Sequence, residues 1–156
     1  MEIKKYLSDL GIDFKEFLHP AVYTCEDAEK HTSEVRGDHL KSLLIKDRNS
    51  KKFYLVILPA DEKLDMKSLG KTLDEKIKFA NEDNLKGLLN VEPGSVSPFG
   101  LIYDKEHKIK IVIRKDIWDS EFVSFHPNTN TATLELSGED FRKYVKSLGN
   151  ELMLVD

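Results

Sequence analysis

The chain has 156 residues, of which 40% are hydrophobic and 33% are charged. These values are typical of one folded domain spanning residues 1–156, and they exclude a disordered or fibrous protein. The formal net charge of −4 argues against a protein that coats long nucleic acid duplexes, so we expect no DNA partner, although a local basic patch can still bind a few phosphates.

The sequence also bears on location and redox chemistry. It contains no run of about 18 apolar residues, so we expect no membrane partner and a cytoplasmic protein. A single cysteine, Cys25, rules out an internal disulfide and a thiolate-rich zinc site.

The first half of the chain predicts alternating helices and strands. Apolar residues at helical spacing predict a helix over residues 3–10 that ends at Gly11, and residues 13–19 alternate like a strand. Thr24 has the position of a helix cap, which predicts a helix to about residue 33. Residues 40–46 and 53–58 are apolar, β-prone runs joined by a polar turn, and the second run is apolar on both faces, as in a central strand or the wall of a barrel.

The second half predicts further short elements. Asp65 and Asn81 are placed to cap helices, and residues 76–80 form a short strand between them. Residues 99–103 and 108–113 are interpreted as a hairpin, and residues 122–125 and 131–136 as two more strands. Ser137 begins a helix that ends at Gly149, before a last strand over 151–155. The predicted class is α+β, with a curled, mixed and largely antiparallel sheet that is barrel-like and flanked by helices.

Common catalytic motifs are absent. The five histidines lack metal-ligand spacing, so we expect neither a metal nor a cofactor. Four features remain, and each has a functional and a structural interpretation. Lys41, near the start of a strand, either points inward or reaches solvent, and the loop from Gly94 to Pro98 either gathers backbone N–H groups or only connects two elements. His126 either orients a ligand or caps a turn, and Cys25 is either reactive or a small buried residue.

Five segments along nearly the whole chain are more specific in combination: residues 19–24 (HPAVYT), 40–47 (LKSLLIKD), 64–67 (LDMK), 91–101 (VEPGSVSPFGL) and 125–133 (FHPNTNTAT). In this order they resemble the free-standing aminoacyl-tRNA deacylases related to YbaK and to the editing insertion of bacterial prolyl-tRNA synthetases. The resemblance is closest to the ProXp-ala (ProX) branch. It implies a trans-editing enzyme that hydrolyses mischarged Ala-tRNA(Pro) and spares Pro-tRNA(Pro).

The resemblance also assigns roles to residues. Lys41 becomes the essential basic residue, and the loop Gly94, Ser95, Val96, Ser97 and Pro98 grips the aminoacyl group and polarises its carbonyl. His126, Thr24 and Asn130 match substrate-pocket positions. The implied partners are the acceptor end of tRNA(Pro) and prolyl-tRNA synthetase. A basic cluster around the first predicted hairpin is a candidate contact for the acceptor stem, or else a solvated turn: Lys46, Arg48, Lys51 and Lys52.

One position departs from the pattern. Ser42 follows Lys41 where close relatives often carry Asn, and it is closer to the Thr of the YbaK branch. The preference among alanine, cysteine and serine esters therefore stays open, and a Cys-tRNA(Pro) or Ser-tRNA deacylase of YbaK type is an alternative. Two other classes remain: a non-catalytic module that binds tRNA or a synthetase, and a thiol enzyme that uses Cys25.

Overall fold

The computed structural model describes residues 2–18, 38–126 and 131–156. Within these ranges no helix is both long and apolar enough to cross a membrane. The elements in chain order are α1 (Glu2–Asp9), β1 (Lys15–Leu18), β2 (Asp38–Asp47), β3 (Phe53–Pro59), α3 (Met66–Leu73), β4 (Ile77–Phe79), α4 (Glu82–Asn84), η1 (Leu85–Leu89), η2 (Pro98–Tyr103), β5 (Ile109–Arg114), α5 (Lys115–Trp118), β6 (Phe122–Phe125), β7 (Ala132–Ser137), α6 (Gly138–Leu148) and β8 (Leu152–Val155).

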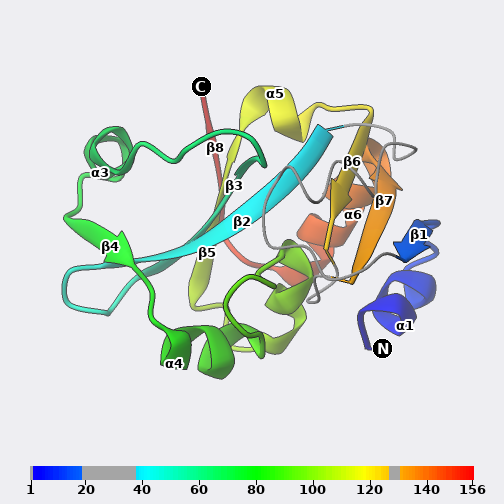
Figure 1. Cartoon of the computed structure of the whole chain (residues 1–156), viewed down its shortest axis with the longest axis horizontal. Helices are drawn as coiled ribbons and strands as arrows, with labels where there is room; N and C mark the ends of the chain where they lie inside the picture. The colour runs from blue at the N-terminus through cyan, green and yellow to red at the C-terminus, as the bar shows by residue number, and fades with distance from the viewer. Residues whose placement is uncertain (1, 19–37, 127–130) are drawn as a thin grey trace.

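The described strands form one mixed sheet in the order β1-β7-β6-β2-β3-β5-β8, and β4 pairs with β2 off this path. The pairs β2–β6, β3–β5 and β5–β8 are parallel, and the other four are antiparallel. The predicted α+β class and mixed sheet flanked by helices are thus confirmed. Figure 1 shows β2 crossing the middle of the molecule, with β6, β7 and β1 towards one side and β3, β5 and β8 towards the other.

Two hydrophobic cores lie on opposite faces of β3 and β5, because successive side chains of a strand alternate. The main core takes Leu55 and Ile57 of β3 and the three isoleucines of β5, and α6 packs Phe141 and Tyr144 into it. The second core lies beneath α3 and takes the alternate residues of the same strands; its buried members are Ile45, Tyr54, Val56, Leu58, Leu69 and Val112. The prediction of a central strand that is apolar on both faces is therefore confirmed for β3.

Local signals fix the ends of several elements. Asp65 accepts a hydrogen bond from the Ser68 N–H at the start of α3, and Ser137 accepts one from Asp140 N–H at the start of α6. Gly149 ends α6 with a φ of 81°, a left-handed conformation that costs glycine little. Asn81 caps α4 as predicted, but the helix continues as a π-helical turn over Leu85–Leu89.

The predicted hairpin of residues 99–103 and 108–113 is wrong. Residues 98–103 form the 3₁₀ helix η2, and only the second segment is a strand, β5, which runs parallel to β3. Ser97 supplies the physical reason: its side chain accepts the Phe99 N–H, and Pro98 sits at the first helical position, where its missing N–H costs nothing. The predicted Thr24 helix lies outside the described residues.

Candidate functional site

Lys41 and Ser42 lie near the start of β2 and face opposite sides of the sheet. Lys41 is half-buried and stands opposite Leu58 of β3, on the face of the second core. Ser42 faces the main core together with Leu40 and Leu44, and only 4% of it is exposed. Its hydroxyl oxygen is buried and makes no hydrogen bond to the described part of the chain.

His126 follows β6 and approaches β2 near Lys41. Its Nδ1 lies 2.9 Å from the carbonyl oxygen of Ala132, and its ring centroid lies 6.3 Å from that of His39. His39 precedes Lys41 by two residues on β2, so alternation puts their side chains on the same face. The structure therefore brings His126 to the side of β2 on which Lys41 lies.

The loop from Gly94 to Pro98 contains the backbone groups that can bind a polarised oxygen. Gly94 has a φ of 88° and is exposed, and Val96 packs against the main core. Ser95 N–H donates to the carbonyl of Glu92 at 3.1 Å, whereas no hydrogen bond among the described residues uses the N–H of Gly94 or Val96. A left-handed glycine whose own N–H, like that of Val96, has no acceptor among the described residues is suited to an anionic or carbonyl oxygen.

The end of this loop is anchored in the main core. Ser97 is 1% exposed, and its hydroxyl accepts the Phe99 N–H at 3.2 Å. The Tyr144 hydroxyl donates to the carbonyl oxygen of Pro98 at 2.8 Å. Phe99 packs edge-on against Phe125, with ring centroids 5.8 Å apart. Since Phe125 directly precedes His126, the loop end and His126 are both fixed relative to β6.

Two predicted pocket residues cannot be placed in this arrangement. Thr24 and Asn130 lie outside the described residues, as does Cys25. Of the predicted site residues the structure describes Lys41, the loop and His126; Lys41 lies on the face of β2 towards the second core, whereas the loop packs on the main core through Val96. Among the described residues, no group of histidine, cysteine, aspartate and glutamate side chains could hold a metal ion.

Only some residues of the predicted basic cluster around the turn between β2 and β3 are exposed to solvent. Lys46 is 6% exposed and donates to the Asn84 side chain at 2.9 Å, so it does not face solvent. Lys52 is exposed but pairs with Glu75, and that hydrogen bond raises the pKa of Lys52. Arg48 and Lys51 are exposed on the turn between β2 and β3. Lys46 therefore drops out of the surface that could contact phosphates.

Asp47 gives this turn its shape. It is 6% exposed, and its carboxylate accepts the N–H groups of Lys51 at 2.6 Å and of Lys52 at 2.9 Å. The Lys52 hydrogen bond is the main reason that the pKa of Asp47 is lowered. The carboxylate thus stabilises the turn, on which the side chains of Arg48 and Lys51 are exposed.

A second group of basic residues joins this turn in space, and the sequence analysis missed it. Lys51 and Lys52 line a hollow of about 340 Å³ whose opposite wall contains His107, Lys108 and Lys110. Lys108 pairs with Glu106 and Lys110 with Glu151, so much of the positive charge is balanced locally. The alternation of lysines with isoleucines over residues 108–113 predicts that these lysines point away from the main core. It does not predict that they lie close to the turn between β2 and β3.

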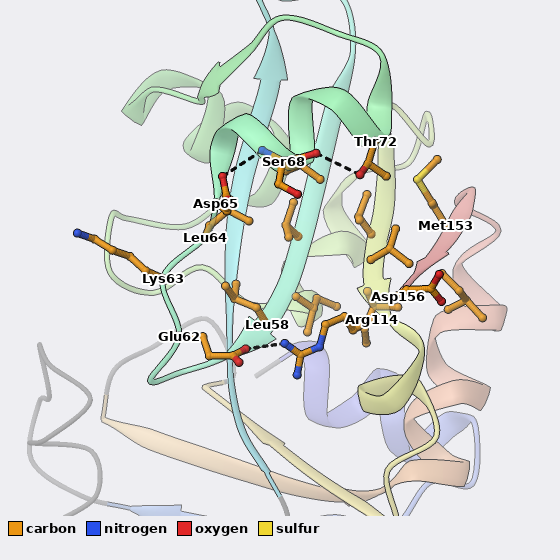
Figure 2. A pocket seen from close by; sticks show the side chains of 17 residues that line it. Leu58, Glu62, Lys63, Leu64, Asp65, Ser68, Thr72, Arg114, Met153 and Asp156 are labelled. Carbon is orange, nitrogen blue, oxygen red and sulfur yellow. Dashed lines mark hydrogen bonds and ion pairs between the residues drawn. The ribbon is translucent and has the colours of Figure 1, made fainter.

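A hollow of about 590 Å³ lies between α3 and strands β3, β5 and β8 (Figure 2). Leu58 and Met153 contribute to its apolar floor, and Arg114 stands at its edge and pairs with Glu62 at 2.7 Å. Asp65 also lines it, but its carboxylate is used in capping α3. In this structure the segment 64–67 of the family pattern forms the start of α3, with Asp65 as its cap.

Comparisons with known proteins identify the family to which the chain belongs. The family model described as the aminoacyl-tRNA editing domain matches residues 19–144. The prolyl-tRNA editing protein ProX of Acetoanaerobium sticklandii is 36% identical over 151 residues, which cover 96% of this chain and 92% of that protein. The prolyl-tRNA synthetase associated domain-containing protein 1 of Mus musculus is 32% identical over 160 residues, covering 99% and 94%.

Solved structures share the fold at low sequence identity. A crystal structure described as a candidate trans-editing enzyme for prolyl-tRNA synthetase superposes with a TM-score of 0.69 at 17% identity, covering 97% of this chain and 92% of that one. A protein described only as hypothetical gives a TM-score of 0.76 at 18% identity, with 97% of each chain covered. From the match over residues 19–144 and the identity to full-length relatives, the chain belongs to the aminoacyl-tRNA editing domain family and is an aminoacyl-tRNA deacylase.

Proposed function

We propose that the protein hydrolyses alanine from mischarged tRNA(Pro) in trans and spares prolyl-tRNA(Pro). A synthetase pocket shaped for proline discriminates against the smaller alanine by only about 1–3 kcal/mol, so some mischarged product forms. A second pocket that is too small for proline would remove this product. The ProX relative, which is named a prolyl-tRNA editing protein, supports proline tRNA as the substrate.

The observation that carries the proposal is the loop with its left-handed glycine. Gly94 and Val96 have N–H groups that the described residues do not use, and the loop is held at one end by the buried Ser97 and Pro98. In the proposed complex these N–H groups bind the ester carbonyl and stabilise the oxyanion that forms on it. Donors fixed in advance in this way lower the barrier because they need no reorganisation during the reaction.

Lys41 and His126 would hold the terminal nucleotide. Lys41 lies near the start of β2, and His126, which follows β6, lies beside His39 at that end of the strand. A lysine ammonium on a flexible stem suits a phosphate or a developing negative charge. We assign Lys41 to the terminal phosphate and ribose, and His126 to positioning, with Thr24 and Asn130 as further pocket residues. Water is the nucleophile, because an aminoacyl ester is already activated and needs mainly orientation.

The turn between β2 and β3 is the proposed contact for the acceptor stem. Lys46 lies five positions after Lys41 along β2, so the end of the strand at the turn lies about 17 Å from Lys41 at roughly 3.4 Å per residue. Arg48 and Lys51 are exposed there, and Lys52 adds a paired charge. Replacing Arg48 and Lys51 by glutamine should weaken tRNA binding and reduce its salt dependence by about two phosphate contacts.

The matched control for the turn changes two lysines of α6. Lys143 and Lys146 are exposed, so replacing both by glutamine alters the net charge by the same amount. An unchanged salt dependence in the Arg48 and Lys51 variant, or an equal change in the control, would contradict the proposed contact.

The deciding experiment compares the hydrolysis of alanyl-, cysteinyl-, seryl- and prolyl-tRNA(Pro) by the purified protein. We expect alanyl-tRNA(Pro) to be the preferred substrate and prolyl-tRNA(Pro) to be spared. Preference for cysteinyl or seryl esters would favour the YbaK-type alternative, and binding without hydrolysis would favour a non-catalytic module. An alkylating reagent that leaves turnover unchanged would exclude Cys25 as a nucleophile.

Lys41→Met tests the assigned cation. We expect the hydrolysis rate to fall about a hundredfold or more, as for other groups that stabilise a transition-state charge. Lys78→Met, which changes an exposed lysine on β4, serves as the matched control and should retain the wild-type rate. A Lys41→Met protein that is folded and hydrolyses alanyl-tRNA(Pro) at the wild-type rate would remove Lys41 from the mechanism.

A further inference from the structure

Tyr144 of α6 is a buried residue whose polar group reaches the loop. Its side chain is fully buried, and its hydroxyl donates to the carbonyl oxygen of Pro98 at 2.8 Å across 46 positions of sequence. Its ring is held on two sides: the Tyr6 ring packs edge-on at 5.8 Å, and the Phe99 ring is tilted at 5.4 Å. The position of the hydroxyl is therefore set by the core and not by the loop.

The hydrogen bond from the Tyr144 hydroxyl holds only the Pro98 end of the loop. At the other end Gly94 is exposed, and a Cβ built on it would meet nothing within 4 Å. The hydrogen bond from Ser95 N–H to Glu92 is local and cannot fix the loop relative to the sheet. Val91 and Val96 also pack in the main core, so the Ser97–Pro98 end is one of the anchors that place the Gly94 and Val96 N–H groups, and it is the one that carries a side-chain hydrogen bond from another element.

We propose that Tyr144 is a positioning residue for editing: its hydroxyl fixes the Pro98 carbonyl, and through it the backbone donors that bind the ester. This inference rests on the proposed function of the loop. Donors act on an oxyanion at 2.7–3.1 Å, and a displacement of about 1 Å can cost a hundredfold in rate. A hydroxyl anchored in the core is suited to prevent such a displacement.

The environment of Tyr144 keeps the hydroxyl a donor. Burial raises the pKa of Tyr144 well above its ordinary value, and the nearby Tyr6 acts in the same direction. The side chain therefore stays protonated at neutral pH, where its hydroxyl can donate to the Pro98 carbonyl. This distinguishes a positioning role from a general acid or base.

Tyr144→Phe tests the proposal because it keeps the ring and removes only the donor. We expect kcat for alanyl-tRNA(Pro) to fall about tenfold, with KM changed less than twofold, since the misplaced donors act mainly in the transition state. We also expect the ratio of alanyl to prolyl hydrolysis to fall, because a looser loop forms a less selective wall. Amide hydrogens of residues 95–97 should exchange faster with solvent.

Tyr103→Phe is the matched control. Tyr103 is the last residue of η2, and burial, with Glu2 second, raises the pKa of its hydroxyl. This variant also removes one tyrosine hydroxyl, here from the short helix that begins at Pro98, but its kcat, KM and loop exchange should remain at wild-type values. Thermal unfolding of both variants sets an assay temperature at which each is folded.

Several outcomes would overturn the proposal. Equal kcat values for the two variants, or unchanged loop exchange in Tyr144→Phe, would show that the hydroxyl does not position the loop. A Tyr144→Phe protein that fails to fold would show that the hydroxyl supports the whole core instead. If the wild-type protein hydrolyses no aminoacyl-tRNA(Pro), the proposed function fails, and the exchange experiment still decides whether Tyr144 fixes the loop.

Discussion

Replacing Gly94 by alanine isolates the conformational requirement of the loop. At this position a Cβ meets no heavy atom within 4 Å, so the substitution introduces no steric clash within the protein. The φ of 88° lies in the left-handed region, where an L-residue costs about 1–2 kcal/mol. Alanine also restricts the unfolded chain, which returns about 0.4–1 kcal/mol. The net expected loss of unfolding free energy is therefore about 1 kcal/mol.

Gly87→Ala is the matched control, because a Cβ there also meets nothing within 4 Å but the glycine lies inside the helical turn η1. Alanine should stabilise this position by about 0.5–1 kcal/mol. The free energy of unfolding in urea should thus be about 1.5–2 kcal/mol lower for Gly94→Ala than for Gly87→Ala, at every protein concentration. Gly94→Ala should also lose activity towards alanyl-tRNA(Pro), because the loop relaxes to a different φ.

Equal stability of the two variants would refute the conformational argument. A Gly94→Ala protein of reduced stability but full activity would instead show that the loop conformation does not control the reaction. Only the combination of a small stability loss with a large activity loss supports the role given to Gly94. Gly87→Ala should keep the wild-type rate, because η1 contributes no residue to the proposed site.

Two further predictions concern side chains away from the loop. Ser42→Ala should be neutral or stabilise the protein by up to about 1 kcal/mol in urea unfolding, because its buried hydroxyl has no partner among the described residues; a loss above about 1 kcal/mol would contradict this. Arg114 makes two hydrogen bonds to Asp116, and these chiefly lower the pKa of that carboxylate. The folded protein thus holds this proton more weakly than the unfolded chain, so the stabilisation is present above about pH 4 and is lost as the pH falls through the folded pKa. Arg114→Gln should reduce the loss of stability between pH 5 and pH 3, by a modest and salt-dependent amount, and an unchanged pH profile would refute the assignment.

Local signals made much of the fold predictable from sequence. The strands β2 and β3 were predicted because apolar runs on both sides of a polar turn have few alternatives, and they pair as a hairpin. The caps Asp65 and Ser137 were predicted because a side-chain acceptor at a helix start depends only on nearby residues. The π-helical form of residues Leu85–Leu89 was not predicted, because their apolar spacing matches that of an ordinary helix.

Non-local contacts explain what the sequence could not predict. Residues 99–103 are apolar enough for a strand; Ser97 and Pro98 start the helix η2 there, and the packing of Phe99 beside Phe125 in the main core is the non-local contact that favours the helix. The parallel pairing of β5 with both β3 and β8 requires long connections, whose end point no local pattern specifies. Lys46 was expected at the surface, and its burial follows from Asn84, a residue 38 positions away.

The candidate site divides in the same way between local and distant information. The loop from Gly94 to Pro98 is recognisable from sequence, since glycine and proline restrict a backbone by known amounts. Tyr144 is not, because a tyrosine at a core position of a helix has the same pattern whether its hydroxyl is used or not. Only the 2.8 Å bond to Pro98 distinguishes it from an ordinary core residue.

The alternation of β2 constrains how a substrate can reach this site. Lys41 and Ser42 are neighbours in sequence but face opposite sides of the sheet, and the loop packs on the Ser42 side through Val96. A ligand that meets both the loop and the Lys41 ammonium must therefore cross the start of β2, where His126 lies beside His39. A lone amino acid is too small to span that edge, whereas an amino acid esterified to a terminal nucleotide is not. Free alanine should for this reason inhibit the reaction poorly, and a short RNA ending in an aminoacylated adenosine should be hydrolysed; strong inhibition by free alanine would mean that the amino acid alone accounts for the binding.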